Sequence, residues 1–237
     1  MWLIALLTFI VSLVLVPLYV VYKMSGYSKV SKHSFLVVHI SLFLDESSWL
    51  LRRVFRSYLW LYHEYCIYSK LESMKGYGKI LANLYIPQWM TVTDTEIDIL
   101  FIHESGIYCI EAKDFAGYIS WGEYDTLWSQ KFGRRLRYTF PNPLRQNCGH
   151  IKSLEKLIPF PIESLVVFSW RSKISTYLSE GKVIQRHQMK KYFWEKKEII
   201  FSKWQIDQIY ETLVPYSHSS KEQESKHIQE IHEHYAH

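Results

Sequence analysis

Residues 95–121 read TEIDILFIHESGIYCIEAKDFAGYISW, and this stretch decides the fold. Two runs rich in β-branched and aromatic residues, Ile97–His103 and Ile107–Phe115, are separated by Glu-Ser-Gly, which predicts a β-hairpin. Ala116-Gly117 interrupts the second run, and a third strand is expected over Tyr118–Trp121. The stretch therefore predicts three successive strands, of which the first two pair with each other.

The register of this hairpin decides which polar side chains share a face. Successive residues of a strand face opposite sides, so Glu111 and Lys113 lie on one face. A two-residue turn at Glu104-Ser105 sets Asp98 opposite Glu111, whereas a turn at Ser105-Gly106 sets Asp98 opposite Lys113. Both turns leave the three side chains on one face, but a three-residue loop without a bulge would reverse Asp98.

Two carboxylates and one ammonium are thus expected to converge on an otherwise apolar pair of strands. Opposed carboxylates destabilise a sheet unless something neutralises them, and a divalent cation does so. Mg²⁺ suits hard oxygen ligands and often takes one or two carboxylates together with substrate phosphate. The competing interpretation is that Asp98 and Glu111 are solvated on an exposed face, with Lys113 as their cross-strand ion-pair partner.

The spacing of Asp98, Glu111 and Lys113 resembles the core of the PD-(D/E)xK nuclease superfamily, and the surrounding residues resemble its nuclease-related domain family. The resemblance covers roughly residues 75–213 and rests on EIDILFIHESGIYCIEAKDFAG (96–117), Trp128, NPLRQN (142–147), His150, SLVVFS (164–169) and IIFSKWQIDQIYETL (199–213). It implies a restriction-endonuclease-like α/β fold, with a mixed central sheet flanked by helices and the hairpin near the centre of that sheet.

The resemblance also implies roles for particular residues. Asp98 and Glu111 would be ligands of Mg²⁺ or Mn²⁺, Lys113 the catalytic lysine, and Gln146 a residue near the site. One departure stands out, because the family usually opens its first helix with Gly-Glu, and here Gly78 is followed by Lys79.

A helix is expected over about Leu144–Leu157, after the turn marked by Asn142-Pro143. Its spacing puts Gln146, His150 and Ser153 within reach of one face. Gln146 could orient water or substrate there, and a structural role is favoured for His150. Farther on, Ser202 is a candidate N-cap for a helix over Lys203–Leu213.

A basic cluster follows the hairpin, with aromatic residues between its members: Lys131, Arg134, Arg135 and Arg137. As a loop in a nuclease these residues would hold phosphates, which would make binding strongly dependent on salt. An ordinary solvated loop is the alternative.

Residues 2–22 form an apolar run without a charged side chain, and twenty-one helical residues reach roughly 32 Å, enough to span a bilayer. A cleaved signal peptide would instead need a basic start and a small-residue cleavage site, and neither is evident. Lys23, Lys29 and Lys32 follow the run, so the positive-inside bias puts the N-terminus outside and the rest in the cytoplasm, at the inner membrane.

The expected organisation is a transmembrane anchor (1–23), a connector (24–74), a nuclease-related domain (75–215) and a polar flexible tail (216–237). The connector contains SSWLLRRVFRSYLWLYHEYC, an amphipathic helix that either packs on the domain or lies on the inner leaflet.

The composition agrees with a single domain in a reducing compartment. The chain has 237 residues and a formal net charge of +5, which is compatible with nucleic acid or anionic lipid as a partner. Its three cysteines are odd in number and widely spaced, which excludes a disulfide framework and a CxxC zinc pattern.

The function expected from the sequence is therefore a membrane-anchored, Mg²⁺-dependent nuclease that acts on DNA in preference to RNA. Two alternatives remain open. One is a nuclease-like module that binds nucleic acid without turnover, which Lys79 favours, and the other is a membrane scaffold for proteins that the sequence does not identify.

Overall fold

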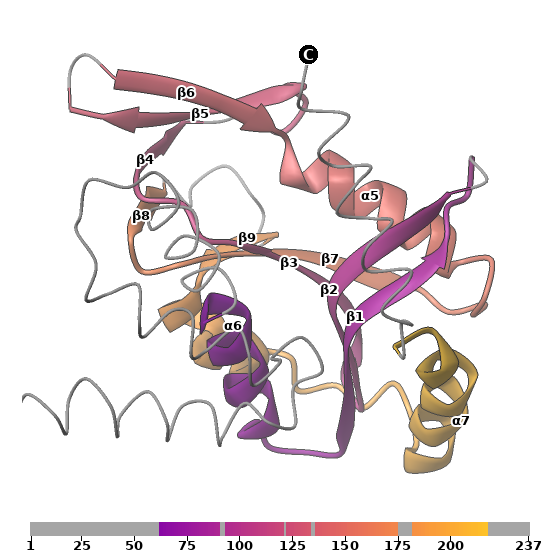
Figure 1. Cartoon of the computed structure of the whole chain (residues 1–237). Helices are drawn as coiled ribbons and strands as arrows, with labels where there is room; N and C mark the ends of the chain where they lie inside the picture. Colours follow the sequence, from indigo (N-terminus) through magenta and orange to yellow (C-terminus); the bar gives the residue numbers. More distant parts are fainter. Residues whose placement is uncertain (1–61, 91–92, 121, 134–135, 175–181, 218–237) are drawn as a thin grey trace, which may run out of the picture. The chain divides into compact units, whose positions relative to one another are not determined.

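The computed structural model describes residues 62–90, 93–120, 122–133, 136–174 and 182–217 (Figure 1). The elements from residue 67 onward belong to one compact unit. A helix over residues 62–72 comes first, and the elements after it follow in this order: β1 (Gly78–Pro87), β2 (Asp94–His103), β3 (Gly106–Lys113), β4 (Gly117–Ser120), β5 (Leu127–Phe132), β6 (Leu136–Pro141), α5 (Pro143–Leu154), β7 (Ile162–Phe168), β8 (Ser172–Ile174), β9 (Val183–Gln185), η3 (Arg186–Gln188), α6 (Met189–Glu195), α7 (Lys203–Leu213) and η4 (Val214–Ser217).

The larger sheet is mixed and has the strand order β1-β2-β3-β7-β9. The first three strands are joined by tight antiparallel connections, and β7 and β9 then add in parallel. Strand β3 lies in the middle of this order, so the predicted hairpin does occupy the centre of a sheet. The expected strand over 164–169 is present as β7.

Both faces of this sheet are covered, which explains why β2 and β3 are nearly continuous apolar runs. On one face, Leu100 and Cys109 pack with residues of α5 and α7 such as Leu154 and Ile206. On the other face, the neighbouring strand residues pack with Ile67 and Leu71 and with residues of α6. Figure 1 shows α5 and α7 on one side of the sheet and α6 on the other.

The remaining strands form a second sheet with the order β6-β5-β4-β8. Its buried residues Ile119, Trp128 and Phe140 pack with Val166 and Phe168 of the larger sheet. The predicted mixed sheet flanked by helices is therefore present, and the structure adds a second sheet that the sequence did not predict. The chain changes direction after β3 at Gly117, whose φ is +80°, and the next strand, β4, pairs with β5 and β8.

Local sequence signals fix the helix boundaries. Asn142 caps α5 by accepting hydrogen bonds from the backbone N–H groups of Leu144 and Arg145, and Pro143 occupies the first turn. Ser202 and Gln205 form a capping box at the start of α7, which confirms the predicted cap. Helix α5 ends at Leu154, three residues before the expected end at Leu157.

Three expectations concern residues outside this description. The apolar run 2–22 and the rest of the segment 1–61 are not among the described residues, nor is the tail over 218–237. Within the described ranges, every helix is too short or too polar to cross a membrane.

Candidate active site

The site begins where the central hairpin stops pairing. The ladder of β2 and β3 runs from His103 paired with Gly106 to Ile99 paired with Ile110. This is the register of a Glu104-Ser105 turn, the first of the two predicted alternatives. Asp98 and Glu111 lie one residue beyond the last pair, on the face that α5 covers.

Beyond the last β2–β3 pair, the side chain of Asp98 accepts the hydrogen bond of a β3 backbone N–H group. Its Oδ2 accepts a hydrogen bond of 2.8 Å from the backbone N–H of Ala112, and the residue is only 8% exposed. The side chain is therefore held beside β3 by the backbone, and its direction does not depend on a surface contact.

Glu111 is the most deeply buried acid of the site, at 1% exposure. Its Oε1 accepts a hydrogen bond from Nζ of Lys113 at 2.5 Å. Its Oε2 is buried and has no hydrogen-bond partner, and it lies 3.4 Å from Nε2 of His150, which also lacks one. The two atoms lie within ion-pair distance of each other but make no hydrogen bond, so Oε2 keeps capacity for a further ligand.

Helix α5 supplies the other side of the site. Oε1 of Gln146 accepts a hydrogen bond of 3.1 Å from Nζ of Lys113. One turn later, Nδ1 of His150 lies 3.0 Å from Oγ1 of Thr95, which fixes the ring against β2. Ser153, expected on the same face, instead bonds the backbone N–H of Trp89 and lies away from the carboxylates.

Asn147 fixes the position of α5 on the sheet. Its Nδ2 donates to the carbonyl of Cys109 at 2.8 Å and to Oγ of Ser164 at 2.9 Å. The Cys109 thiol donates to its Oδ1 at 2.8 Å. Because Asn147 is fully buried, these bonds tie the helix to β3 and β7 and aim its neighbour Gln146 at Lys113. Asn147 was not predicted from the sequence as a site residue, although it lies within the NPLRQN motif.

The pKa values of the two carboxyl groups are shifted in opposite directions. Burial, together with the nearby charge of Glu111, raises the pKa of Asp98 to about 7. Burial also acts to raise the pKa of Glu111, but the charge of Lys113 and the contact with His150 outweigh it and lower that pKa below its ordinary value. The site is therefore short of positive charge. Lys113 compensates the carboxylate of Glu111, and the carboxyl group of Asp98 holds a proton near neutral pH.

This donor set fits a divalent cation. Two buried carboxylates lie on the same face there, and Oε2 of Glu111 makes no hydrogen bond and has only the 3.4 Å contact with Nε2 of His150. Among the described residues no group of three or more acidic, histidine or cysteine side chains is arranged to hold an ion. The remaining positions around a Mg²⁺ ion would then be filled by water and substrate oxygens, which that ion commonly keeps.

Two members of the basic cluster lie in strands and not in the expected loop, because Lys131 on β5 pairs directly with Arg137 on β6. Arg134 and Arg135 are outside the described residues.

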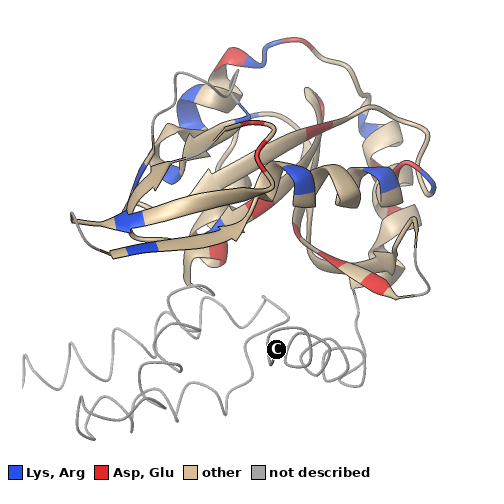
Figure 2. Cartoon of the chain, turned by 90° about the horizontal axis from the view of Figure 1, so that it is seen from above, with Lys and Arg blue, Asp and Glu red and all other residues tan. Residues whose placement is uncertain are grey.

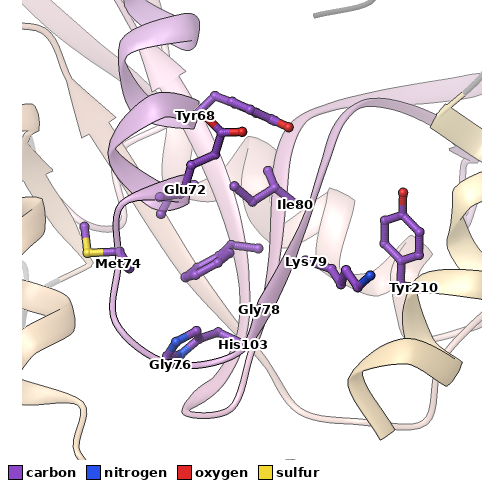
Figure 3. Close-up of a pocket in the computed structure, with 11 residues that line it drawn as sticks. Tyr68, Glu72, Met74, Gly76, Gly78, Lys79, Ile80, His103 and Tyr210 are labelled. Atoms are coloured by element: carbon purple, nitrogen blue, oxygen red, sulfur yellow. The ribbon is translucent and has the colours of Figure 1, made fainter. Parts of the chain in front are cut away.

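Lys79 is not at the start of a helix and lies apart from the carboxylates. It belongs to strand β1, and its Nζ lies 3.6 Å from the carboxylate of Asp207 and 5.2 Å from the ring centroid of Tyr210. Lys79 and Tyr210 border a pocket of about 380 Å³ that is lined by none of the predicted site residues (Figure 3). The expectation that Lys79 replaces a metal-site glutamate is therefore wrong, because helix 62–72 ends before Gly78.

Comparison with known proteins agrees with this geometry. Residues 60–169, which include Asp98, Glu111, Lys113 and Asn147, match the nuclease-related domain family. This stretch is a nuclease-related domain. Domains of this family belong to the PD-(D/E)xK-like nuclease superfamily, whose members typically use divalent metals.

The chain is also similar to an uncharacterized protein of Bacillus anthracis. The two are 27% identical over 173 residues, which cover 71% of this chain and 80% of the relative. No solved structure matches the chain.

Proposed function

We propose that the nuclease-related domain hydrolyses phosphodiester bonds of DNA, in preference to RNA, with Mg²⁺ or Mn²⁺ held by Asp98 and Glu111. The observation that carries the proposal is a pair of buried carboxylates, Asp98 and Glu111, with Lys113 bonded to Oε1 of Glu111. The buried Oε2 of Glu111 makes no hydrogen bond and has only a 3.4 Å contact with His150. A purely structural ion pair would satisfy its oxygens within the protein.

Each residue has a distinct task in this proposal. A bound divalent cation would supply charge neutralisation at the phosphate and a more acidic water. Lys113, as an ammonium, stabilises the negative charge that develops on the phosphate oxygens when water attacks phosphorus. Gln146 is a positioning residue, since it accepts a hydrogen bond from Nζ of Lys113 and so restricts where that charge lies. The attack breaks one P–O bond, and the departing oxygen takes a proton, which leaves a phosphomonoester and an alcohol.

Cleavage assays on the full chain test this proposal. Linear, circular and single-stranded DNA are incubated with Mg²⁺ or Mn²⁺ and either the wild type, Lys113→Ala or Glu111→Gln. Loss of a charge-stabilising donor should lower the rate about 10²- to 10³-fold. Lys190→Ala, on the exposed surface of α6, is the matched lysine control and should cleave like the wild type. Wild-type cleavage no faster than that of Lys113→Ala removes the enzymatic proposal.

Calorimetry separates the enzyme from a module that only binds nucleic acid. An enzyme of this kind should give a Mg²⁺ or Mn²⁺ binding heat that Asp98→Asn abolishes. A chain that binds nucleic acid but gives the same trace for wild type and Asp98→Asn is a binding module.

We also propose that residues 2–22 anchor the chain in the inner membrane, with the domain on the cytoplasmic side. Support comes from the uncharged apolar run and from the lysines at 23, 29 and 32 that follow it. Carbonate-washed membranes should retain the full chain, and deletion of residues 2–22 should release it. Recovery of the full chain in the soluble fraction rules out the anchor.

A further inference from the structure

A row of side chains crosses the second sheet at right angles to its strands. Tyr118 on β4 pairs with Lys131 on β5 and with Lys173 on β8, and Lys131 pairs with Arg137 on β6. Side chains of directly paired residues lie on the same face of a sheet. We call these four residues the cross-sheet row: Lys173, Tyr118, Lys131 and Arg137.

The cross-sheet row faces away from the core. The residues of opposite parity, Ile119, Trp128 and Phe140, are buried against the larger sheet. Tyr118 is 59% exposed, although it is a large aromatic residue in a strand. Figure 2 shows basic residues on neighbouring strands of this sheet.

The positive charges of the row are not balanced by ion pairs among the described residues. Lys131 and Arg137 are direct cross-strand partners, an arrangement that destabilises a sheet. Within the described part of the chain, the ion pairs of the lysines and arginines involve none of the row's three cations. Arg137 uses two of its five donors on Oγ of Ser129, which holds the guanidinium flat on the sheet. Like charges kept together at a cost indicate an anionic partner.

The exposed ring of Tyr118 indicates which kind of anion the cross-sheet row binds. Nζ of Lys173 lies 5.1 Å from the centroid of this ring, so a cation and an aromatic face are presented together. Proteins that bind single strands combine a cationic track for phosphates with exposed aromatic rings on which bases stack. In a duplex the base faces are already stacked on each other and do not reach such a ring.

We propose that the cross-sheet row binds single-stranded nucleic acid, with a base stacked on Tyr118 and phosphates held by Lys131, Arg137 and Lys173. This inference rests on the proposed nuclease function and names its substrate as single-stranded. The chain links the two sites: Tyr118 follows Lys113 by five residues, so their Cα atoms are at most about 18 Å apart. At this separation one strand is long enough to reach both sites.

Fluorescence anisotropy with the full chain tests the inference, in EDTA so that cleavage does not interfere. The probes are a labelled mixed-sequence oligonucleotide and the duplex of the same length. The wild type should prefer the single strand, and Tyr118→Ala should weaken that binding roughly five- to hundredfold, as expected for loss of one stacked base. Tyr118→Phe keeps the ring and should bind like the wild type. Tyr124→Ala removes an 89% exposed tyrosine outside the row and is the matched control.

The charges are tested through the salt dependence. The logarithm of the association constant falls linearly with the logarithm of the salt concentration. Lys131→Gln and Lys173→Gln should each make this slope shallower by about 0.7, whereas Lys190→Gln should leave it unchanged. Thermal melts establish that each variant is folded.

Several outcomes would overturn the inference: Tyr118→Ala binding like the wild type, equal or tighter binding of the duplex, or binding only to anionic vesicles. The result is independent of catalysis. Binding that Tyr118→Ala weakens, without cleavage that depends on Lys113, refutes the nuclease and keeps the row. Cleavage that depends on Lys113 but is unchanged in Tyr118→Ala keeps the nuclease and refutes the row as its binding site.

Discussion

Replacing Asp98 with asparagine should stabilise the metal-free protein at alkaline pH and abolish its response to Mg²⁺. The substitution keeps the shape of the side chain and an oxygen that accepts the hydrogen bond from the N–H of Ala112. It removes only the buried negative charge. The test therefore addresses the electrostatics of the site and leaves its packing alone.

The magnitude follows from the pKa of Asp98, which burial and the charge of Glu111 raise from 3.8 to about 7. Between those values the folded state holds a proton that the unfolded state has released. The free energy of unfolding therefore falls as pH rises from about 4 to about 7, and it levels off above. A difference of about three pH units at ~1.36 kcal/mol each amounts to roughly 4 kcal/mol. Glu111, whose pKa is lowered, contributes in the opposite sense and only at more acidic pH.

Urea unfolding of the full chain at intervals from pH 5 to pH 8 measures this effect. In EDTA, the stability difference between Asp98→Asn and the wild type should grow in favour of the variant as pH rises. With Mg²⁺ at a hundredfold excess over its Kd, the wild type should gain about 2.7 kcal/mol and the variant nothing. A difference between the two proteins that stays constant across this pH range, or an equal gain from Mg²⁺, would refute the reasoning.

Two further substitutions test the supports of the site. Asn147→Ala should cost roughly 2–4 kcal/mol in urea unfolding, because it leaves the buried partners of its side chain unsatisfied, and it should slow cleavage by loosening α5; normal stability would mean that α5 is held by its apolar contacts alone. Trp128→Ala should cost about 3–5 kcal/mol because it empties the space between the two sheets, whereas Leu127→Ala, at a 52% exposed position next to it, should cost little. Equal losses for these two variants would contradict the assigned packing of the second sheet.

The sequence carried the local features of the site. The alternation within residues 97–113, together with the short Glu-Ser-Gly turn, was enough to set Asp98, Glu111 and Lys113 on one face. The i, i+4 spacing of Gln146 and His150 likewise placed both on the side of α5 that meets the hairpin. These features follow from strand and helix periods, which residues close in sequence determine among themselves.

Other features of the protein could be established only from the tertiary structure. The alternation of side chains along β4 to β6 could be written from the sequence. The sequence did not show that these strands leave the central sheet, or that β4 pairs with β8, more than fifty residues farther along the chain. For the same reason the basic residues were expected in a loop, and Lys173 was not connected with Lys131. Lys79 was misplaced because the family pattern assigned a helix start to a residue that β1 uses as a strand.

The sequence by itself thus determined which side chains of the hairpin face the same way, and the tertiary structure decided what they meet. Direction within a strand or helix is set by the repeat of the backbone. Burial, the missing partner of Glu111 Oε2 and the raised pKa of Asp98 arise only when α5 closes over β3 and excludes water. The cost of an unsatisfied charge depends on its surroundings, and those are assembled from segments that are distant along the chain.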